Sequence, residues 1–389
     1  MPSDSMLFIM FLVFTGAAIF ATVALYARQA LIVSYIVLGV VLGPSLLGWV
    51  TDASLIREVA DIGIMFLLFL LGLNMHPQKL FRLLGSATIV TGLSSLIFGA
   101  IGLAAGQLLG FHWIESLIVG GGLMFSSTIV GLKLLPTTVL HHRHTGEVMI
   151  SILLLQDIIA IVMLLVLRAG LGGETLITDV VGLVLALVGI CILAWLVERF
   201  VLIPLIARFD VIQEYIFLLA IGWCLGLAEL SVWLGLSHEI GAFIAGVALA
   251  SSRISLFIAE NLKPLRDFFL IIFFFMLGAG LDLHQLLDVL VPAVVLAAVL
   301  LLVKPFVFDK LLVRTGESPP RAKEMGLRLG QGSEFTLLIA VLALETGALR
   351  SQAAHLLELS TIITMMISMY LIVWRYPTPI AVSDELRRN

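Results

Sequence analysis

Charged residues are scarce in this sequence: Asp, Glu, Lys and Arg make up 12% of the 389 residues, whereas hydrophobic residues make up 61%. An average soluble domain is about 25% charged and roughly 45–50% apolar. So little charge excludes a water-soluble fold of this size, and we expect an all-α membrane protein in a lipid bilayer. Basic stripes with interleaved aromatic residues are also lacking, so we expect no nucleic-acid partner.

Cysteine is almost absent, and so are the common motifs of catalysis. Cys191 and Cys224 both lie inside apolar segments and lack metal-ligand spacing, so we expect neither a structural disulfide nor a resident metal. The sequence has no GxSxG, no HExxH and no pair of catalytic aspartates. We therefore expect no enzyme and no cofactor. The first apolar segment lacks a basic n-region and a small-residue cleavage site, which favours a membrane span over a signal peptide.

Long apolar segments, in contrast, are abundant. A helix that crosses a bilayer needs about 20 mostly apolar residues. On this criterion the sequence predicts thirteen spans, at 6–26, 30–44, 58–74, 86–109, 114–135, 147–168, 176–198, 211–229, 236–252, 267–281, 289–310, 322–345 and 353–374. Alternate loops hold most of the Lys and Arg residues, whereas the remaining loops hold only Arg57, Arg168 and Arg350. The positive-inside rule then predicts an outside amino terminus and a cytoplasmic carboxyl terminus.

Three motifs recur about 207 positions apart and in the same order. Residues 34–43 (SYIVLGVVLG) correspond to 241–250 (GAFIAGVALA), 72–76 (GLNMH) to 280–284 (GLDLH), and 126–128 (SST) to 333–335 (SEF). The offset spans seven helices, an odd number, so the second copy is predicted to cross the membrane in the opposite sense. Such inverted-topology repeats are typical of secondary transporters, whose binding sites lie at mid-membrane where paired helices break.

Two of the predicted spans carry residues that interrupt helices. The span 114–135 contains GGGLMFSST, and the span 322–345 contains GQGSEFT. Gly costs about 1 kcal/mol in a helix interior, and Ser and Thr offer the backbone alternative hydrogen-bond partners. Small residues also let helices pack closely, which is the simpler interpretation of either span alone. Because the two interruptions occupy repeat-related positions, we expect broken helices that cross and aim their ends at a shared point.

Asp157 lies in the middle of the predicted span 147–168, with no basic residue at helical spacing. An aspartate at mid-bilayer costs about 2.5–3.5 kcal/mol on insertion scales, which makes it a functional candidate by default. The alternative is an acid that is kept neutral, or locked in a salt bridge, for packing. Gln156 precedes it and can offer a carbonyl oxygen to a cation.

Other polar residues of the apolar segments support this site or stand apart from it. Lys304 either neutralises a carboxylate or extends its side chain to the inside face. Arg328 and Glu334 are candidates for pairing with each other, and Gln331 and Ser333 accompany Glu334 in the second interruption.

Three further features are interpreted as ordinary polar surface. Asp61 and Glu239 lie near predicted helix ends. The run His141–His144 suggests a metal site or a pH sensor, but we favour the interpretation that these are solvated loop residues.

These motifs together resemble the monovalent cation:proton antiporter-2 family, and within it the glutathione-gated potassium-efflux (Kef-type) branch. The resemblance is carried by SYI…G…GP at 34–44, FSST at 125–128, LQD at 155–157, GAFIAG at 241–246 and GQGSEF at 330–335. The match covers essentially the whole chain in the right order.

The resemblance implies a thirteen-helix homodimer of the sodium/proton antiporter fold that works by an elevator motion. It assigns 1–85 and 211–285 to a dimerisation (scaffold) domain, and 86–170 and 286–376 to an ion-transporting core. Residues 171–210 form a linker helix and 377–389 a cytoplasmic tail. The expected location is the bacterial inner membrane.

The resemblance also gives residue roles. Asp157 matches the family's ion-binding aspartate, and Lys304 looks like the lysine that pairs with a preceding aspartate in electrogenic relatives. Here Gln156 stands at that preceding position. One titratable site is thus removed, and we expect one cation per proton and no net charge moved. Kef-type proteins normally continue into a nucleotide-binding regulatory domain, which is expected to be a separate polypeptide or missing from this chain.

The sequence therefore predicts a monovalent cation/proton antiporter, with potassium as the first choice of cargo. Asp157 would hold either a proton or the cation. Hydroxyl and carbonyl oxygens would complete the coordination shell, from Ser126, Ser127, Thr128 and Gln156. A sodium/proton antiporter of the same fold is the alternative, followed by a cation channel.

Overall fold

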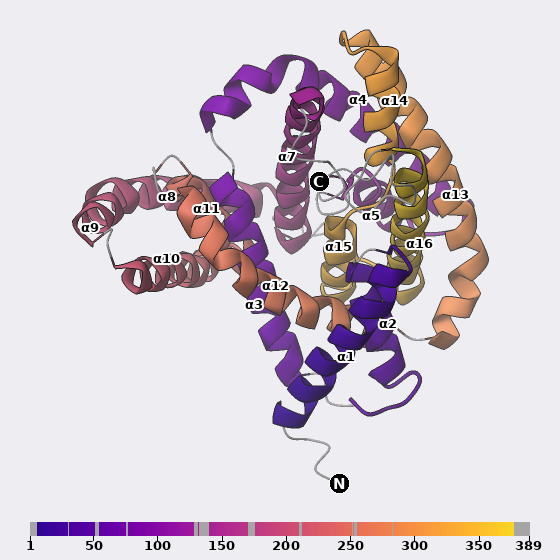
Figure 1. Ribbon diagram of the computed structural model, residues 1–389, viewed down its shortest axis with the longest axis horizontal. Coiled ribbons are helices and arrows are strands. Elements are labelled where there is room, and N and C mark those ends of the chain that lie inside the picture. Colours follow the sequence, from indigo (N-terminus) through magenta and orange to yellow (C-terminus); the bar gives the residue numbers. More distant parts are fainter. Residues whose placement is uncertain are drawn as a thin grey trace. The chain divides into compact units, whose positions relative to one another are not determined.

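The computed structural model describes residues 6–29, 31–50, 54–74, 77–127, 131, 140–169, 176–209, 212–250, 252, 255–281 and 283–376. Throughout these ranges all regular secondary structure is helical (Figure 1). Each of the thirteen predicted spans contains at least one helix. Two predicted spans contain helices that stop inside the span.

The helices of the first half have the bounds α1 (Met6–Tyr26), α2 (Leu31–Leu42), α3 (Ser54–Asn74), α4 (Pro77–Leu108), α5 (Trp113–Gly122), α7 (Leu140–Ala169), α8 (Leu176–Val197), the π-helix η1 (Glu198–Leu202) and α9 (Ile203–Phe209). Those of the second half are α10 (Gln213–Trp233), α11 (His238–Leu249), α12 (Ser255–Ala279), α13 (Leu283–Arg314), α14 (Pro319–Arg328), α15 (Glu334–Glu345) and α16 (Ser351–Arg375).

Several of these helices suit a bilayer by length and composition. Six apolar stretches of the described helices are long enough to cross a membrane: Leu7–Tyr26, Ala87–Leu108, Leu185–Phe209, Gln213–Trp233, Leu287–Arg314 and Ser351–Arg375. Shorter apolar stretches lie in α2, α3, α7 and α11. Large apolar side chains such as Leu96, Leu185 and Leu302 point outward and are more than 60% exposed, as expected where lipid is the solvent.

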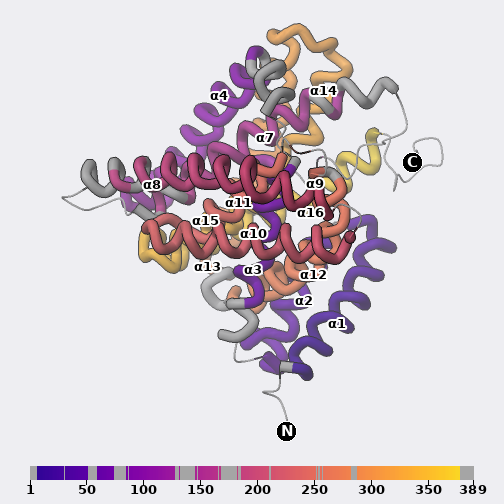
Figure 2. The backbone as a smooth tube through the Cα atoms, turned by 90° about the vertical axis from the view of Figure 1, so that its left-hand side faces the viewer, coloured from indigo at the N-terminus to yellow at the C-terminus, as the bar shows by residue number. Residues whose placement is uncertain are grey.

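The chain divides into two compact units. Unit 1 comprises Met1–Ala17, Tyr35–Phe81 and Arg168–Gly280, and unit 2 comprises Ala18–Ser34, Arg82–Leu167 and Leu281–Asn389. In unit 1, α3 packs against α11 and α12, and α10 packs against α11. Figure 2 shows the long helices α8 and α10 of this unit running nearly parallel. In unit 2, α13 packs against α14 and α16 (Figure 1).

Two glycines of the repeated motifs make equivalent contacts in unit 1. Gly39 of α2 lies against the backbone of α12 at Phe275, and Gly246 of α11 lies against the backbone of α3 at Phe69. A Cβ atom at either glycine would overlap that backbone. Gly39 and Gly246 are 207 positions apart, so both copies of the motif use glycine for the same close helix approach.

Two further glycines, Gly72 and Gly278, make close contacts of the same kind. Gly72 of α3 lies against the backbone at Phe243, and Gly278 of α12 lies against the backbone at Ile36. Phe243 and Ile36 are again 207 positions apart. The repeat seen in the sequence thus corresponds to a reciprocal set of helix contacts.

An apolar cluster holds four helices of unit 2 together. It draws Val90 and Phe98 from α4, Met149, Ile152 and Leu153 from α7, Phe308 and Leu312 from α13, and Met325 from α14, with Leu329 directly after α14. The rings of Phe98 and Phe308 meet edge to face, with centroids 5.4 Å apart. This cluster fixes α7 and α13, which carry Asp157 and Lys304, against α4 and against α14, the first half of the second interrupted span.

Candidate ion-binding site at the interrupted helices

The first interruption follows α5. This helix ends at Gly122, inside the predicted span 114–135, and residues 123–127 are not helical. Gly120 lies against the backbone of α4 at Gly99, which brings this end of α5 close to α4. The predicted interruption is therefore confirmed as far as Ser127. Thr128 lies outside the described residues.

The second interruption separates α14 from α15. Residues 329–333 are not helical, and α15 begins at Glu334. Ser333 caps α15, because its hydroxyl accepts a hydrogen bond from the N–H of Phe335 at 3.1 Å. Glu334, which is 4% exposed, lies in the first turn, where the helix dipole favours an acidic side chain. The break predicted in 322–345 is confirmed.

The two interruptions are joined by hydrogen bonds. The Ser126 hydroxyl donates to the carbonyl of Leu329 at 2.7 Å, and the Thr336 hydroxyl donates to the carbonyl of Gly122 at 2.7 Å. Gly122 is the last residue of α5, and Leu329 directly follows α14. The two residues are 207 positions apart. Each break thus satisfies the terminal carbonyl of the other, which holds the two interruptions against each other.

Lys304 of α13 lies at this crossing. Its side chain is fully buried, and Nζ donates to the carbonyls of Phe125 at 2.6 Å and Gln331 at 3.1 Å. The ammonium group also lies 5.2 Å from the ring centroid of Phe98. The alternative in which Lys304 extends to the inside face is wrong. Among the described residues Lys304 forms no ion pair either. Its ammonium group instead donates hydrogen bonds to one backbone carbonyl of each break.

Gln156 of α7 clamps the first break. Its Oε1 accepts from the N–H of Ser126 at 3.0 Å, and its Nε2 donates to the carbonyl of Met124 at 3.2 Å. The amide therefore bridges two backbone groups that an unbroken helix would have paired. We expected this oxygen to be available to a cation, but the structure engages it with the protein. Asp157, the next residue along α7, is 1% exposed.

Replacing Gln156 by Glu tests this clamp. Glu keeps the shape and can accept from Ser126 N–H, but its second oxygen faces the Met124 carbonyl. Only the protonated acid can donate to that carbonyl. We therefore expect Gln156→Glu to unfold near the wild-type temperature at low pH and to lose thermal stability as pH rises and the new carboxyl ionises. Because two facing acceptors cost about 1–3 kcal/mol, the loss is several degrees.

The matched control for the clamp is Gln352→Glu, which changes an exposed glutamine of α16. Melting curves of both variants against pH are the measurement. A Gln156→Glu curve that runs parallel to wild type across pH would show that the clamp does not hold the break.

Gln331 and its neighbours tie the second break to α16. Gln331 Nε2 donates to the carbonyl of Ser127 at 3.4 Å, and its Oε1 accepts from the Ser368 hydroxyl at 3.1 Å. The N–H of Gly332 donates to the Thr364 hydroxyl at 2.9 Å. Gln331 thus links both interruptions to α16, a role that its polarity alone did not indicate.

Other predicted polar residues lie elsewhere. Arg328, fully buried, forms an ion pair with Glu324 one turn earlier on α14 at 2.8 Å, a partner that we did not expect. Asp61 and Glu239 belong to unit 1, whereas the residues of this site belong to unit 2. The side chains of His141–His144 lie outside the described part of the structure.

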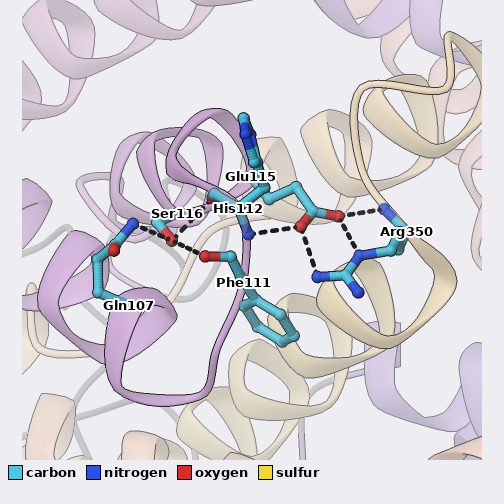
Figure 3. A network of polar contacts seen from close by, with 6 residues as sticks. All are labelled: Gln107, Phe111, His112, Glu115, Ser116 and Arg350. Carbon is cyan, nitrogen blue, oxygen red and sulfur yellow. Dashed lines mark hydrogen bonds and ion pairs between the residues drawn. The ribbon is translucent and has the colours of Figure 1, made fainter.

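One ion pair of unit 2, between the buried carboxylate of Glu115 and the exposed guanidinium of Arg350, was missed in the sequence. The Glu115 carboxylate accepts from the backbone N–H, Nε and NH2 of Arg350 at 2.8–3.0 Å, and from the N–H of His112 at 2.9 Å (Figure 3). These bonds with Glu115 raise the pKa of the Arg350 guanidinium. They join the start of α5 to the residue that precedes α16. No sequence pattern connects two residues 235 positions apart.

The groups gathered at the crossing are oxygens and one fixed ammonium. Hydroxyl, carbonyl and carboxylate oxygens suit a hard cation such as an alkali metal ion. Across the described residues no group of three or more His, Cys, Asp or Glu could hold a metal ion. Interrupted helices that meet beside a helix with a buried acidic residue are typical of a secondary transporter of ions.

Comparison with known proteins gives the family. Residues 9–374 match the family described as "Sodium/hydrogen exchanger, transmembrane", and the chain belongs to it. The family is one of transporters, not of enzymes. The predicted resemblance to the Kef branch is also confirmed: the glutathione-regulated potassium-efflux system protein KefC of Cronobacter sakazakii is 31% identical over 380 residues.

The matched region covers 95% of this chain but 60% of that KefC protein, so the chain spans about three fifths of such relatives. The iron transporter MagA of Paramagnetospirillum magneticum is 28% identical over 344 residues, which cover 88% of this chain and 79% of MagA. The fold is that of the sodium proton antiporter MjNhaP1 from Methanocaldococcus jannaschii, with a TM-score of 0.70, 18% identity and coverage of 94% of this chain and 95% of that one.

Proposed function

We propose that this protein exchanges potassium ions for protons across a bacterial inner membrane, with Asp157 as the single carrier of either ion. The observation that carries the proposal is the position of Asp157. It is buried on α7 directly after Gln156, whose side chain is hydrogen-bonded to the backbone of an interrupted helix. A buried carboxyl next to unwound backbone has oxygen ligands close by and little water to compete with them.

Competition at one carboxyl couples the two ions. Burial favours the protonated acid, whereas a cation bound to the same carboxyl favours the ionised form. Ser126, Ser127 and Thr128, with backbone carbonyls of both breaks, would complete an oxygen shell around the cation. Gln156 contributes by fixing the backbone of the first break, and its carbonyl oxygen retains a second lone pair for the cation.

The charges around Asp157 favour an electroneutral exchange. The ammonium of Lys304 is bound to two backbone carbonyls, and Gln156 replaces a second acid. One titratable carboxyl then alternates between one proton and one monovalent cation. Each cycle moves no net charge.

The proposed architecture is a homodimer with thirteen spans, an outside amino terminus and a cytoplasmic carboxyl terminus. The reciprocal glycine contacts, and the crossed hydrogen bonds whose acceptors Gly122 and Leu329 are 207 positions apart, support two inverted repeats. We assign transport to the core domain, 86–170 and 286–376, and dimerisation to the scaffold domain, 1–85 and 211–285. An elevator motion of the core would carry Asp157 from one side to the other.

Potassium is proposed as the cargo because KefC, which covers nearly the whole chain, is named a potassium-efflux protein. Sodium is the alternative, because the structural neighbour MjNhaP1 is named a sodium proton antiporter. The part of KefC beyond the matched region leaves room for regulation by a nucleotide-binding domain on a separate or longer polypeptide.

A cation series in proteoliposomes tests the proposal. With a pH-sensitive dye inside, outward potassium gradients should drive proton uptake at a rate that saturates with potassium. Sodium should drive it at least tenfold more slowly, which corresponds to about 1.4 kcal/mol of discrimination. A permeant-ion clamp of the membrane voltage should leave the rate unchanged.

Each alternative has its own outcome in the same assay. Faster flux with sodium would assign the protein as a sodium/proton antiporter. Potassium flux without proton movement would indicate a channel. Either result contradicts potassium/proton exchange.

A further inference from the structure

Helix α16 carries a ridge of buried polar side chains that the proposed mechanism does not use. Its members recur every three or four residues: His355, Glu358, Thr361, Thr364 and Ser368. Taken as whole residues, none of them is more than 5% exposed. Residues at i and i+3 or i+4 are neighbours on a helix surface. The ridge is therefore continuous from the second turn of α16 to the residues that bind the second interruption.

His355 and Glu358 form a buried titratable pair at one end of this ridge. His355 Nδ1 lies 3.0 Å from Glu358 Oε2, and their side chains are 6% and 5% exposed. A carboxyl and an imidazole at this distance can hold a proton between them. Gain or loss of one proton changes the charge inside the transport unit by one.

Charged groups on the helices packed against α16 are engaged elsewhere. The buried ones on α5, α13 and α14 are Glu115, bound to Arg350, Lys304, bound to two carbonyls, and Arg328, bound to Glu324. Glu334 lies at the start of α15. The remaining charged side chains described on these helices, such as Glu345 and Asp288, are exposed or partly exposed. In the described part of the chain, Glu358 forms an ion pair with His355 alone.

The other end of the ridge contacts the second interruption. Thr364 accepts from the N–H of Gly332 and donates to the carbonyl of Thr361, and Ser368 donates to Gln331. Between these bonds and Glu358 lies the buried hydroxyl of Thr361, which has no hydrogen-bond partner in the described part of the chain. At 1.5 Å per residue, Glu358 and Thr364 are about 9 Å apart along the helix.

We propose that His355 and Glu358 form a second proton-binding site of the transport unit, and that its charge acts through α16 on ion binding at the interrupted helices. The inference rests on the proposed function for its effect on transport. The proton-binding step does not depend on it. A unit charge about 9 Å away inside a protein shifts a titration by on the order of one pH unit.

Infrared pH-difference spectroscopy on the full chain in lipid detects the proton directly. The Asp157→Asn background removes the carboxyl of the proposed transport site. In that background we expect a titrating band from the carbonyl stretch of a protonated carboxylic acid. It should vanish in Asp157→Asn/Glu358→Gln and persist in Asp157→Asn/Glu345→Gln, which changes an exposed acid at the end of α15. An unchanged band in the Glu358→Gln pair would overturn the proton site.

A second variant, His355→Gln, tests the pair without depending on whether Glu358→Gln folds. His355→Gln removes the partner that favours the ionised carboxyl, so the band of Glu358 should titrate at higher pH. An unshifted band in His355→Gln would also overturn the pair.

The transport arm uses Glu358→Gln alone. Removing a negative charge from the transport unit lowers the proton affinity of the carboxyl that exchanges ions, so the pH midpoint of exchange should move down, whereas Glu345→Gln should leave it in place. An unmoved midpoint would overturn the action on the interrupted helices. A titrating Glu358 band in a protein that exchanges no ions would contradict the proposed function but leave the proton site standing.

Discussion

The Asp157→Asn variant is expected to carry no cation-coupled proton flux, down to the rate of empty vesicles. Asparagine has almost the shape of aspartate, but it cannot bind a proton at neutral pH and presents no negative charge to a cation. Both halves of the cycle therefore fail together. Proteoliposome flux with potassium inside and a pH-sensitive dye is the measurement.

Folding should survive this substitution. Asp157 is 1% exposed, and exchanging a buried carboxyl for a neutral amide removes the cost of burying a charge. The melting temperature should equal or exceed that of wild type. Asp288→Asn, at an exposed position of α13, is the matched control and should keep full flux. Asp157→Asn that still exchanges potassium for protons would refute the assignment of the carrier.

Replacing Lys304 by methionine is expected to destabilise the site more than any other single change at the crossing. Methionine retains much of the side-chain volume but has no N–H donor. The carbonyls of Phe125 and Gln331 would then lose their shared donor. A buried polar group left unsatisfied costs about 1–3 kcal/mol, and hydrogen bonds to charged groups lie at the upper end. Exchange should fall to background because both interruptions lose their common anchor.

The control for this variant is Lys310→Met, on the same helix, whose side chain is 60% exposed. It should change neither the melting temperature nor the flux, because a solvated ammonium on a mobile side chain adds little stability. Thermal unfolding of the purified variants in detergent compares them. If Lys304→Met melted at the wild-type temperature, the lysine would not be the anchor of the two breaks.

The positions of the helices could be predicted from the sequence because a segment that crosses the hydrocarbon core needs apolar side chains. The first span was predicted at 6–26, and α1 has those bounds. By contrast, α4 begins at Pro77 and α7 at Leu140, well before the apolar parts predicted at 86 and 147. These first turns are polar, and the helix continues past the hydrocarbon because backbone hydrogen bonding does not depend on side-chain polarity. An apolar criterion detects only the membrane part.

The interruptions were predictable because glycine and hydroxyl residues weaken a helix locally, and the repeat supplied a second copy of the signal. The partners of the site were not. Lys304 was expected to bind a carboxylate or to reach water. Its N–H groups instead donate to carbonyls that lack a helical partner because two helices far apart in the sequence break there. Gln156 likewise binds backbone exposed by the break. Such contacts join residues far apart in sequence, and no periodicity records them.

The His355–Glu358 pair was missed in the sequence for a different reason. Its spacing of three residues is local, and helical geometry makes the two side chains neighbours. Neither residue stood out, because the polar character of α16 is spread over hydroxyl residues that are common in membrane helices. Burial on all sides, which the sequence does not specify, distinguishes the pair.

Proton release on potassium binding tests the central claim most directly. Purified protein in weakly buffered detergent solution, held near the midpoint of its exchange activity, is mixed with potassium while a pH indicator is followed. Wild-type protein should release protons in proportion to the potassium bound, and Asp157→Asn should release none. Equal release from the two proteins would contradict a single carboxyl that exchanges a proton for a cation.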